Sequence, residues 1–218
     1  METTNFTKEL VNRIAPFMRT NGFSRKGRHF CKITNDLALC FSIEMPSALV
    51  YVEAYIVPLY IPCEHRYFTY GNRMNQIDSI KLPVLSKSAD ADSIENWCQL
   101  FCDSVSSNML PFFQKVDSPH KLLDYMNSSH FSSTSYIFCP IAEICRLKMF
   151  TYFYASELEM ARNAVIQYCD VLEEMPFTEN ILQMRKSEAI EILQLLDCEE
   201  SAATYRANAV ANTLKLLK

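Results

Sequence analysis

The feature that most constrains this 218-residue chain is a change of hydrophobic period before residue 37. From Phe6 to Met18, apolar residues recur every three or four positions, as they do along one face of an amphipathic helix. From Leu37 to Met45, and again from Val50 to Ile56, apolar residues alternate with others, which predicts two half-buried strands joined by a turn. The change therefore predicts a mixed α+β fold.

Pairing Met45 with Val50 across this turn puts both apolar sets on one side of the sheet. The opposite side then carries Ser42, Glu44, Tyr51, Glu53 and Tyr55. Two further strands are predicted, at Phe23–Ile33 and at about Arg66–Tyr70. We therefore expect an antiparallel meander of about four strands, with the N-terminal helix packed on its apolar face.

The later part of the chain is helical in pattern. Asp92 with Glu95 resembles a capping box that opens one helix, and roughly four antiparallel helices are expected from about residue 140 onward. We expect residues 1–138 to form an α+β domain and residues 139–218 to form a helical extension of two hairpins, packed on or beside it.

Composition and charge narrow the class of protein. Apolar residues make up 49% of the chain, no stretch reaches the roughly 20 apolar residues that span a bilayer, and no signal-peptide pattern opens it. Nine scattered cysteines are interpreted as reduced thiols. The sequence thus predicts a cytoplasmic protein without a membrane segment. A net charge of −4 argues against general nucleic-acid binding, although the first stretch is basic and the final third acidic.

The run Gly22-Phe23-Ser24-Arg25-Lys26-Gly27-Arg28-His29-Phe30, with Leu39–Glu44 and Tyr70–Arg73 after it, is similar to a bacterial family catalogued as domain of unknown function 4304. The resemblance covers about residues 5–140, and the acidic helical tail departs from it. It implies a small α+β domain of the bacterial cytoplasm, with no assigned activity, cofactor or catalytic residue.

The common phosphate-binding and hydrolase motifs are absent. With three glycines in the chain there is no GxGxxG and no GxxxxGK[ST], and neither GxSxG nor HExxH occurs. We expect no cofactor. A zinc site is conceivable, because His29 and Cys31 on one strand and Cys63 and His65 on another segment offer two nitrogens and two sulfurs, but unrelated core and surface residues give the same spacing.

Two clusters are candidate binding or catalytic sites. On the polar sheet side, Glu44 and Glu53 with His29 are candidates for acid–base catalysis, and Tyr51, Tyr55, Arg66 and Arg73 are candidates to line the site. A solvated sheet face with cross-strand pairs explains the same residues. In the basic run, Arg25, Lys26 and Arg28 beside aromatic residues suit an anion, although edge strands carry such charges simply to block aggregation.

Together these features favour a non-enzymatic binding or interaction protein whose partner is another protein or a second copy of the chain. Apolar residues of the last helices suit such docking, namely Ile181, Leu182, Ile190, Leu193 and Leu196. Two alternatives stay open. One is a small enzyme that uses the polar sheet face, and the other is phosphate or nucleic-acid binding through the basic run.

Overall fold

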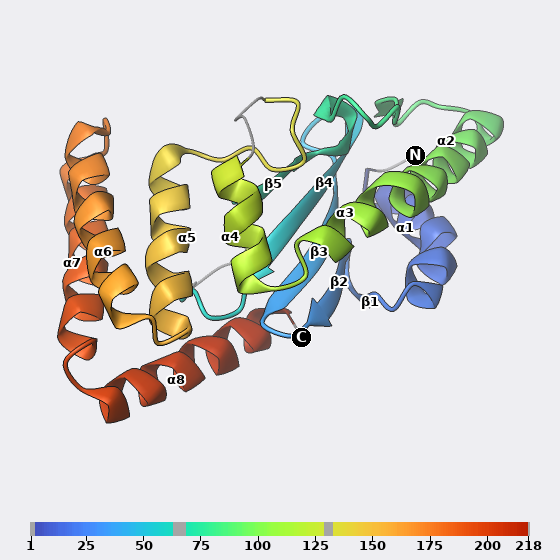
Figure 1. Ribbon diagram of the computed structural model, residues 1–218. Coiled ribbons are helices and arrows are strands. Elements are labelled where there is room, and N and C mark those ends of the chain that lie inside the picture. Colours follow the sequence, from blue (N-terminus) through green and yellow to red (C-terminus); the bar gives the residue numbers. More distant parts are fainter. Residues whose placement is uncertain (1–2, 63–68, 129–132, 218) are drawn as a thin grey trace. The chain divides into compact units, whose positions relative to one another are not determined.

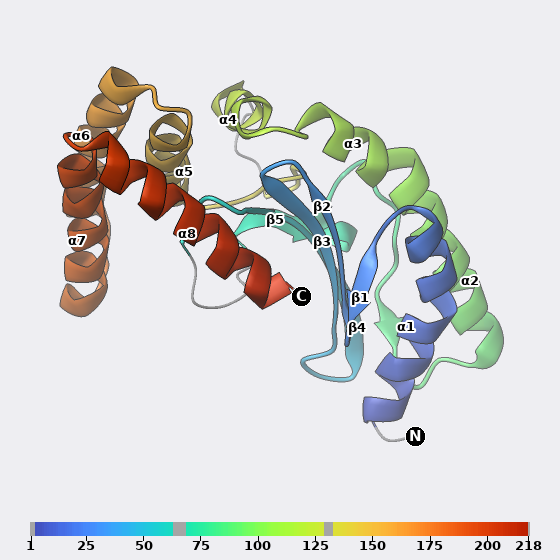
Figure 2. The same ribbon diagram turned by 90° about the horizontal axis from the view of Figure 1, so that it is seen from below.

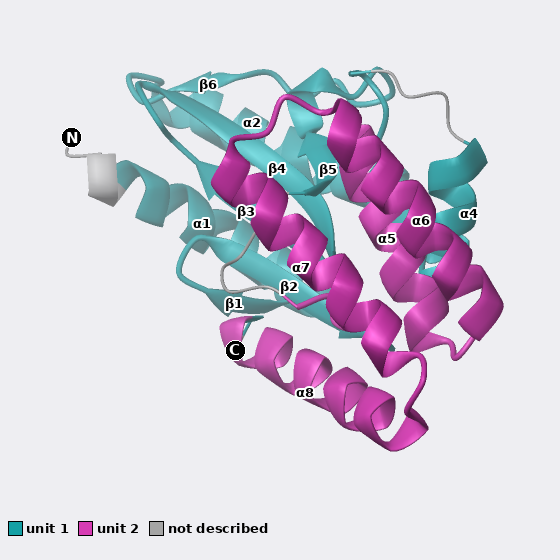
Figure 3. Ribbon diagram, turned by 90° about the vertical axis from the view of Figure 1, so that its left-hand side faces the viewer, with its two compact units in different colours: residues 1–57, 67–138, 217–218 teal, residues 58–66, 139–216 magenta. Residues whose placement is uncertain are grey.

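The structure is a computed structural model that describes residues 3–62, 69–128 and 133–217 (Figure 1). It has the α+β fold that the sequence predicts, with an N-terminal helix, an antiparallel sheet and a helical C-terminal region. Two compact units are distinguished (Figure 3): unit 1 comprises residues 1–57, 67–138 and 217–218, and unit 2 comprises residues 58–66 and 139–216. Among the helices in the described ranges, none is both long and apolar enough to cross a bilayer.

Unit 1 begins with helix α1 (Thr3–Thr20), which runs past Pro16 and is therefore not shortened there. Gly22 follows with φ of 84°, a conformation that glycine adopts without strain. The predicted strand Phe23–Ile33 is wrong in one respect, because it is a hairpin of β1 (Ser24–Lys26) and β2 (His29–Thr34). Gly27, with φ of 64°, makes the reversal.

The sheet continues through β3 (Leu37–Glu44) and β4 (Leu49–Pro58), in the order β1-β2-β3-β4-β5, with β6 (Leu85–Ser86) paired to β4. The prediction that β3 is half-buried is wrong. Its residues from Leu37 to Ile43 are buried on both faces, including Cys40 and Ser42. A small, weakly polar side chain can therefore lie on a buried face or on an exposed face of a sheet. For this reason alternation along a strand does not reveal whether its second face is covered.

Phe41 is the centre of the core on one sheet face. Its ring makes edge contacts with Phe23, Phe101 and Phe113, at centroid distances of 5.4, 6.1 and 5.6 Å. Phe101 and Phe113 belong to α2 (Ala91–Ser104) and α3 (Leu110–Lys115), which are separated by a π-helical turn at Val105–Met109. Figure 2 shows α1, α2 and α3 along this side of the sheet.

Two local predictions in unit 1 need correction. The cap of α2 is Asp90 rather than Asp92, since the Asp90 carboxylate accepts a hydrogen bond from the Ser93 backbone N–H at 2.7 Å. The last strand of the meander is β5 (Tyr70–Arg73), which shares only Tyr70 with the predicted strand at about Arg66–Tyr70; Thr69 is not in a strand, and residues 66–68 lie outside the described ranges. After β5 come the 3₁₀ turn Met74–Gln76 and, later, α4 (Pro119–Ser128).

In unit 2, α5 (Ile141–Tyr154), α6 (Leu158–Glu174) and α7 (Glu179–Leu195) lie side by side, whereas α8 (Glu199–Leu217) turns away from them (Figure 1). The expected four antiparallel helices are therefore three antiparallel helices and a fourth that crosses. The segment that follows β4 belongs to this unit. Tyr60 stacks on Tyr154 at 4.7 Å and its hydroxyl is 2.9 Å from that of Thr151.

Candidate functional site

A groove in unit 1 lies between α1 and the β1–β2 hairpin and has a volume of about 510 Å³. We name it the α1–hairpin groove. It is lined by Thr7, Lys8, Val11, Arg25, Gly27, Arg28 and Met45. Three of these seven residues are cations, and the buried Val11 and half-buried Met45 give it an apolar floor.

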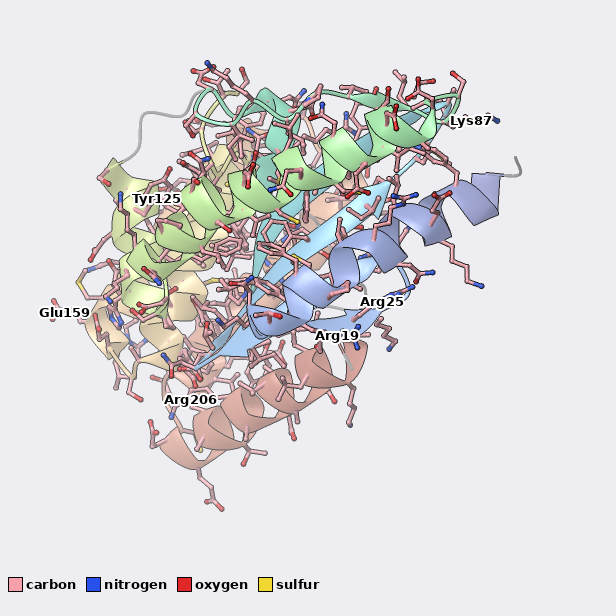
Figure 4. The ribbon with its side chains drawn as sticks, turned by 90° about the vertical axis from the view of Figure 1, so that its right-hand side faces the viewer. Arg19, Arg25, Lys87, Tyr125, Glu159 and Arg206 are labelled. Atoms are coloured by element: carbon pink, nitrogen blue, oxygen red, sulfur yellow. The ribbon has the colours of Figure 1, made fainter. Side chains whose placement is uncertain are left out.

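The cations of the groove are poorly neutralised. Arg25 donates to the Asn12 side-chain oxygen at 2.8 Å and to the Gly27 carbonyl at 2.9 Å, and both of these acceptors are neutral. Figure 4 shows Arg25 alongside α1. No acidic side chain of the described residues lies within ion-pair distance of Lys8 or Arg25. Only Arg28 has such a partner, the Glu44 carboxylate at 3.0 Å. The groove therefore carries uncompensated positive charge.

Local structure explains which basic residues reach the groove. Arg25 lies opposite Phe30 in the hairpin, and Phe30 lies opposite Phe41, so Arg25 shares the helix-covered side of the sheet. Lys26 lies opposite His29 and so belongs to the other side. The predicted basic cluster is thus divided, with Arg25 and Arg28 at the groove and Lys26 away from it.

Lys8 is a cation of the groove that the sequence did not identify as a binding residue. It lies three positions before Val11 on α1, so both residues fall on the same helix face. That face could be recognised from the sequence, but its packing beside the hairpin depends on tertiary structure.

The other candidate cluster is the polar sheet face, which we define as Glu44, Tyr51, Glu53 and Arg73. Glu53 and Arg73 are directly opposite each other on β4 and β5, with Arg73 Nε 3.7 Å from the carboxylate. The Arg73 guanidinium also lies 4.8 Å from the centre of the Tyr51 ring. The structure therefore brings together four of the residues that the sequence predicts there.

The environment of Glu53 favours its protonated form. Burial raises the pKa of Glu53 above its ordinary value, the nearby Glu44 raises it further, and Arg73 and Arg28 oppose the shift. The Glu44 and Glu53 side chains are 23% and 17% exposed, so solvent screens them only in part. Glu44 also accepts a hydrogen bond from the Ser42 hydroxyl. A carboxyl group with a raised pKa can exchange protons nearer to neutral pH.

Tyr55 differs from the prediction because it is buried, whereas His29 lies on the predicted side of the sheet. Tyr55 is buried, 3% exposed, and faces Gly71 rather than solvent. His29 is half-buried on β2, opposite Ser42 and two residues along β3 from Glu44. Tyr55 is therefore not available on the surface to line a site.

The zinc hypothesis is not tested as a whole. Cys63 and His65 lie outside the described residues, so their distance from His29 and Cys31 is not defined. Within the described residues, no group of three or more His, Cys, Asp or Glu side chains is placed to hold a metal ion.

Charged side chains of unit 2 form ion pairs with one another, although the buried Arg185 Nε has no hydrogen-bond partner among the described residues. The guanidinium of Arg146 on α5 lies 2.5 Å from Glu188 on α7, and that of Arg185 lies 2.5 Å from Glu143. A hollow of about 590 Å³ is lined by Tyr154, Ser156, Arg206, Ala207 and Val210. Its cation, Arg206, already bonds Glu199, the Ser156 hydroxyl and the Phe153 carbonyl. These groups are therefore explained by the packing of the helices.

The apolar residues proposed for docking on the last helices are divided. Ile181 and Ile190 are 40% and 53% exposed, whereas Leu196 is buried and Leu182 and Leu193 are half-buried. Part of the predicted stripe is thus helix packing, and part of it is on the surface.

Comparison of the chain with protein-family models, with curated proteins and with solved structures found no match. The similarity to the domain of unknown function 4304, and the bacterial, cytoplasmic setting that it implies, therefore stay predictions.

Proposed function

We propose that this protein is a non-enzymatic binding module that recognises an acidic segment of a partner protein in the α1–hairpin groove. The observation that supports this most is the pair Lys8 and Arg25, two groove cations that no acidic side chain of the described residues neutralises. Exposed charges on the rim of a groove attract an oppositely charged partner and orient it.

The chemistry of the lining defines the occupant. Arginine guanidinium groups bind carboxylates through two parallel hydrogen bonds, and lysine adds a point charge. Val11 and Met45 offer contact to an apolar side chain. A volume of about 510 Å³ lies within the range of sites that hold small ligands or a few residues. A short peptide with acidic residues on either side of an apolar one fits this combination.

Arg28 is shared between the groove and the polar sheet face. Its guanidinium lies 3.0 Å from Glu44 of the polar sheet face, and the same residue lines the groove. A bound carboxylate competes with Glu44 for this cation. Neutralising Glu44 frees Arg28, so we expect the Glu44→Gln variant to bind an acidic occupant more tightly than the native chain.

Selection from a displayed library of random eight-residue peptides tests the proposal with no assumption about the identity of the partner. The native chain should enrich peptides that combine Asp or Glu with an apolar residue, and binding should weaken steeply with salt. The double variant Lys8→Gln/Arg25→Gln should lose this enrichment. Arg19→Gln, which removes an exposed cation of α1 outside the groove, should keep it.

Other selection results would contradict the proposal. Enrichment of neutral or basic peptides, or enrichment that survives in the double variant, is incompatible with an acidic occupant of the groove. Binding of a single-stranded oligonucleotide but of no acidic peptide would favour the nucleic-acid alternative. Self-association measured by light scattering, lost in the double variant, would make a second copy the partner.

The enzyme alternative is supported by the polar sheet face, because burial and the nearby Glu44 raise the pKa of Glu53. In such an enzyme, Glu53 exchanges a proton with a substrate and Arg73 holds its anionic group. It requires that Glu53→Gln abolish a turnover activity while the fold is retained. A substrate whose conversion is unchanged in this variant removes the alternative.

A further inference from the structure

Cys31 and Cys40 are directly opposite each other on β2 and β3, and their sulfur atoms are 2.8 Å apart. The hydrogen-bond pattern defines the kind of pair that they form. Ile43 donates its backbone N–H to the Arg28 carbonyl at 3.1 Å, and these two residues are directly opposite, so they form a hydrogen-bonded pair. Pairs alternate along an antiparallel ladder, which makes Cys31 and Cys40 a non-hydrogen-bonded pair.

This position fits the geometry of a disulfide. In a non-hydrogen-bonded pair the two Cα atoms lie about 4.5 Å apart and the side chains are closer than elsewhere in the ladder. Disulfides join residues whose Cα atoms lie roughly 4.4–6.8 Å apart. The backbone of β2 and β3 therefore needs no rearrangement to accept the bond.

The surroundings of the other cysteines differ. Burial raises the pKa of Cys98 and of Cys102 to about 11, which makes these thiols slow to react. Cys198 is exposed, and a hydrogen bond from Ser201 lowers its pKa. Among the described cysteines, Cys198 is thus the exposed reference thiol, whereas Cys31 and Cys40 are buried and are distinguished by their mutual contact.

We propose that Cys31 and Cys40 form a redox modification site, which a small peroxide converts into a cross-strand disulfide between β2 and β3. Cys31 is 5% exposed and Cys40 is 0% exposed, so Cys31 is the residue that the peroxide reaches first. Because the oxidant must pass into a covered sheet, hydrogen peroxide suits the site better than a bulky disulfide.

The chemistry balances in two steps. The Cys31 sulfur attacks one oxygen of hydrogen peroxide, the O–O bond breaks, and a sulfenic acid and one water form. The Cys40 sulfur then attacks the sulfenic sulfur, the S–O bond breaks, the S–S bond forms and a second water leaves with the Cys40 proton. The thiol pair loses two electrons and two protons, and the peroxide gains them.

Peptide mapping of the folded chain tests this directly. The chain is treated with hydrogen peroxide, alkylated while unfolded and cleaved with trypsin. Cleavage after Arg28, Lys32 and Arg66 leaves Cys31 in peptide 29–32 and Cys40 in peptide 33–66. Because Cys63 shares the second peptide, the Cys63→Ser variant is used. We expect the two peptides to be linked, with the loss of two hydrogen atoms, and the link to be reversed by dithiothreitol.

Cys198 serves as the internal measure of oxidant dose, since it is exposed. Oxidation of Cys198 while Cys31 and Cys40 are recovered fully alkylated would overturn the proposal. So would a link from Cys31 to any cysteine other than Cys40. The Cys31→Ala variant should lose the link but keep the circular dichroism spectrum of the native chain. If the Cys31→Ala variant fails to fold, the mapping of the Cys63→Ser chain still tests the proposal.

Discussion

Substitution of Gly71 by alanine tests the pairing that brings Arg73 opposite Glu53. A Cβ atom added at Gly71 would lie 2.2 Å from the Ala54 carbonyl oxygen and 2.5 Å from the Tyr55 Cβ. Real Cβ contacts are essentially never shorter than 3.0 Å, so β4 and β5 must separate by at least about 0.8 Å. The obstacle is largely backbone, which does not move aside as a flexible side chain does.

The expected cost follows from this clash. Overpacking of this kind destabilises by roughly 1–3 kcal/mol, and one weakened hydrogen bond of the ladder adds about 1 kcal/mol. We therefore expect Gly71→Ala to lower the free energy of unfolding of unit 1 by about 2–4 kcal/mol, or Tm by on the order of 10 °C. Denaturant titration followed by circular dichroism measures the first, and scanning calorimetry the second.

Gly27→Ala is the matched control. It lies in the hairpin with φ of 64° and has no atom within 4 Å of an added Cβ, so only the backbone strain of about 1–2 kcal/mol applies. Hydrogen exchange should increase at β5 in Gly71→Ala and not in Gly27→Ala. A Gly71→Ala variant as stable as the native chain, with β5 equally protected, would refute this reasoning.

Two further predictions concern buried charge. Because burial raises the pKa of Glu53, the folded chain binds more protons than the unfolded chain between the ordinary and the raised pKa. Stability from this group is therefore present at acid pH and lost as pH rises through that window. The free energy of unfolding of Glu53→Gln relative to that of the native chain should therefore increase as pH rises above about 4 in denaturant titrations; a difference independent of pH would contradict this. In unit 2, Arg146→Met leaves the Glu188 carboxylate without its partner at 2.5 Å and should cost about 2 kcal/mol in the same titrations. Lys121→Met, which removes a cation whose side chain is 57% exposed, should lower the free energy of unfolding by less than about 1 kcal/mol. Equal losses in the two variants would contradict the prediction that the less exposed Arg146–Glu188 pair contributes more.

The polar sheet face was largely predictable from the sequence, because alternation along two strands is enough to place Glu44, Tyr51 and Glu53 on one side. Alternation does not reveal whether that side is covered. Ser42 and Tyr55 are therefore buried where the pattern predicts exposure. The hairpin at Phe23–Ile33 is a different case. Its turn at Gly27 places only two residues between β1 and β2, and both are exposed, so the sequence of the whole segment resembles that of one continuous strand.

The groove was only partly predictable. Arg25 and Arg28 are apparent as a basic run, but two residues adjacent along a strand point to opposite faces, which separates Lys26 from Arg25. Lys8 joins them through the packing of α1 beside β1, a tertiary contact between segments that have no shared pattern. Cys31 and Cys40 are similar, because only the register of β2 and β3 shows that they face each other.

The central claim is that the groove binds an acidic segment of a partner protein. Its most direct test is affinity capture from a native lysate of the source cells, with mass spectrometry of what is retained by the native chain and by two variants. We predict one protein partner in stoichiometric amount on the native chain and on Arg19→Gln, lost from Lys8→Gln/Arg25→Gln and eluted by salt. A partner retained equally by the double variant, or the absence of any stoichiometric protein partner, would contradict the account.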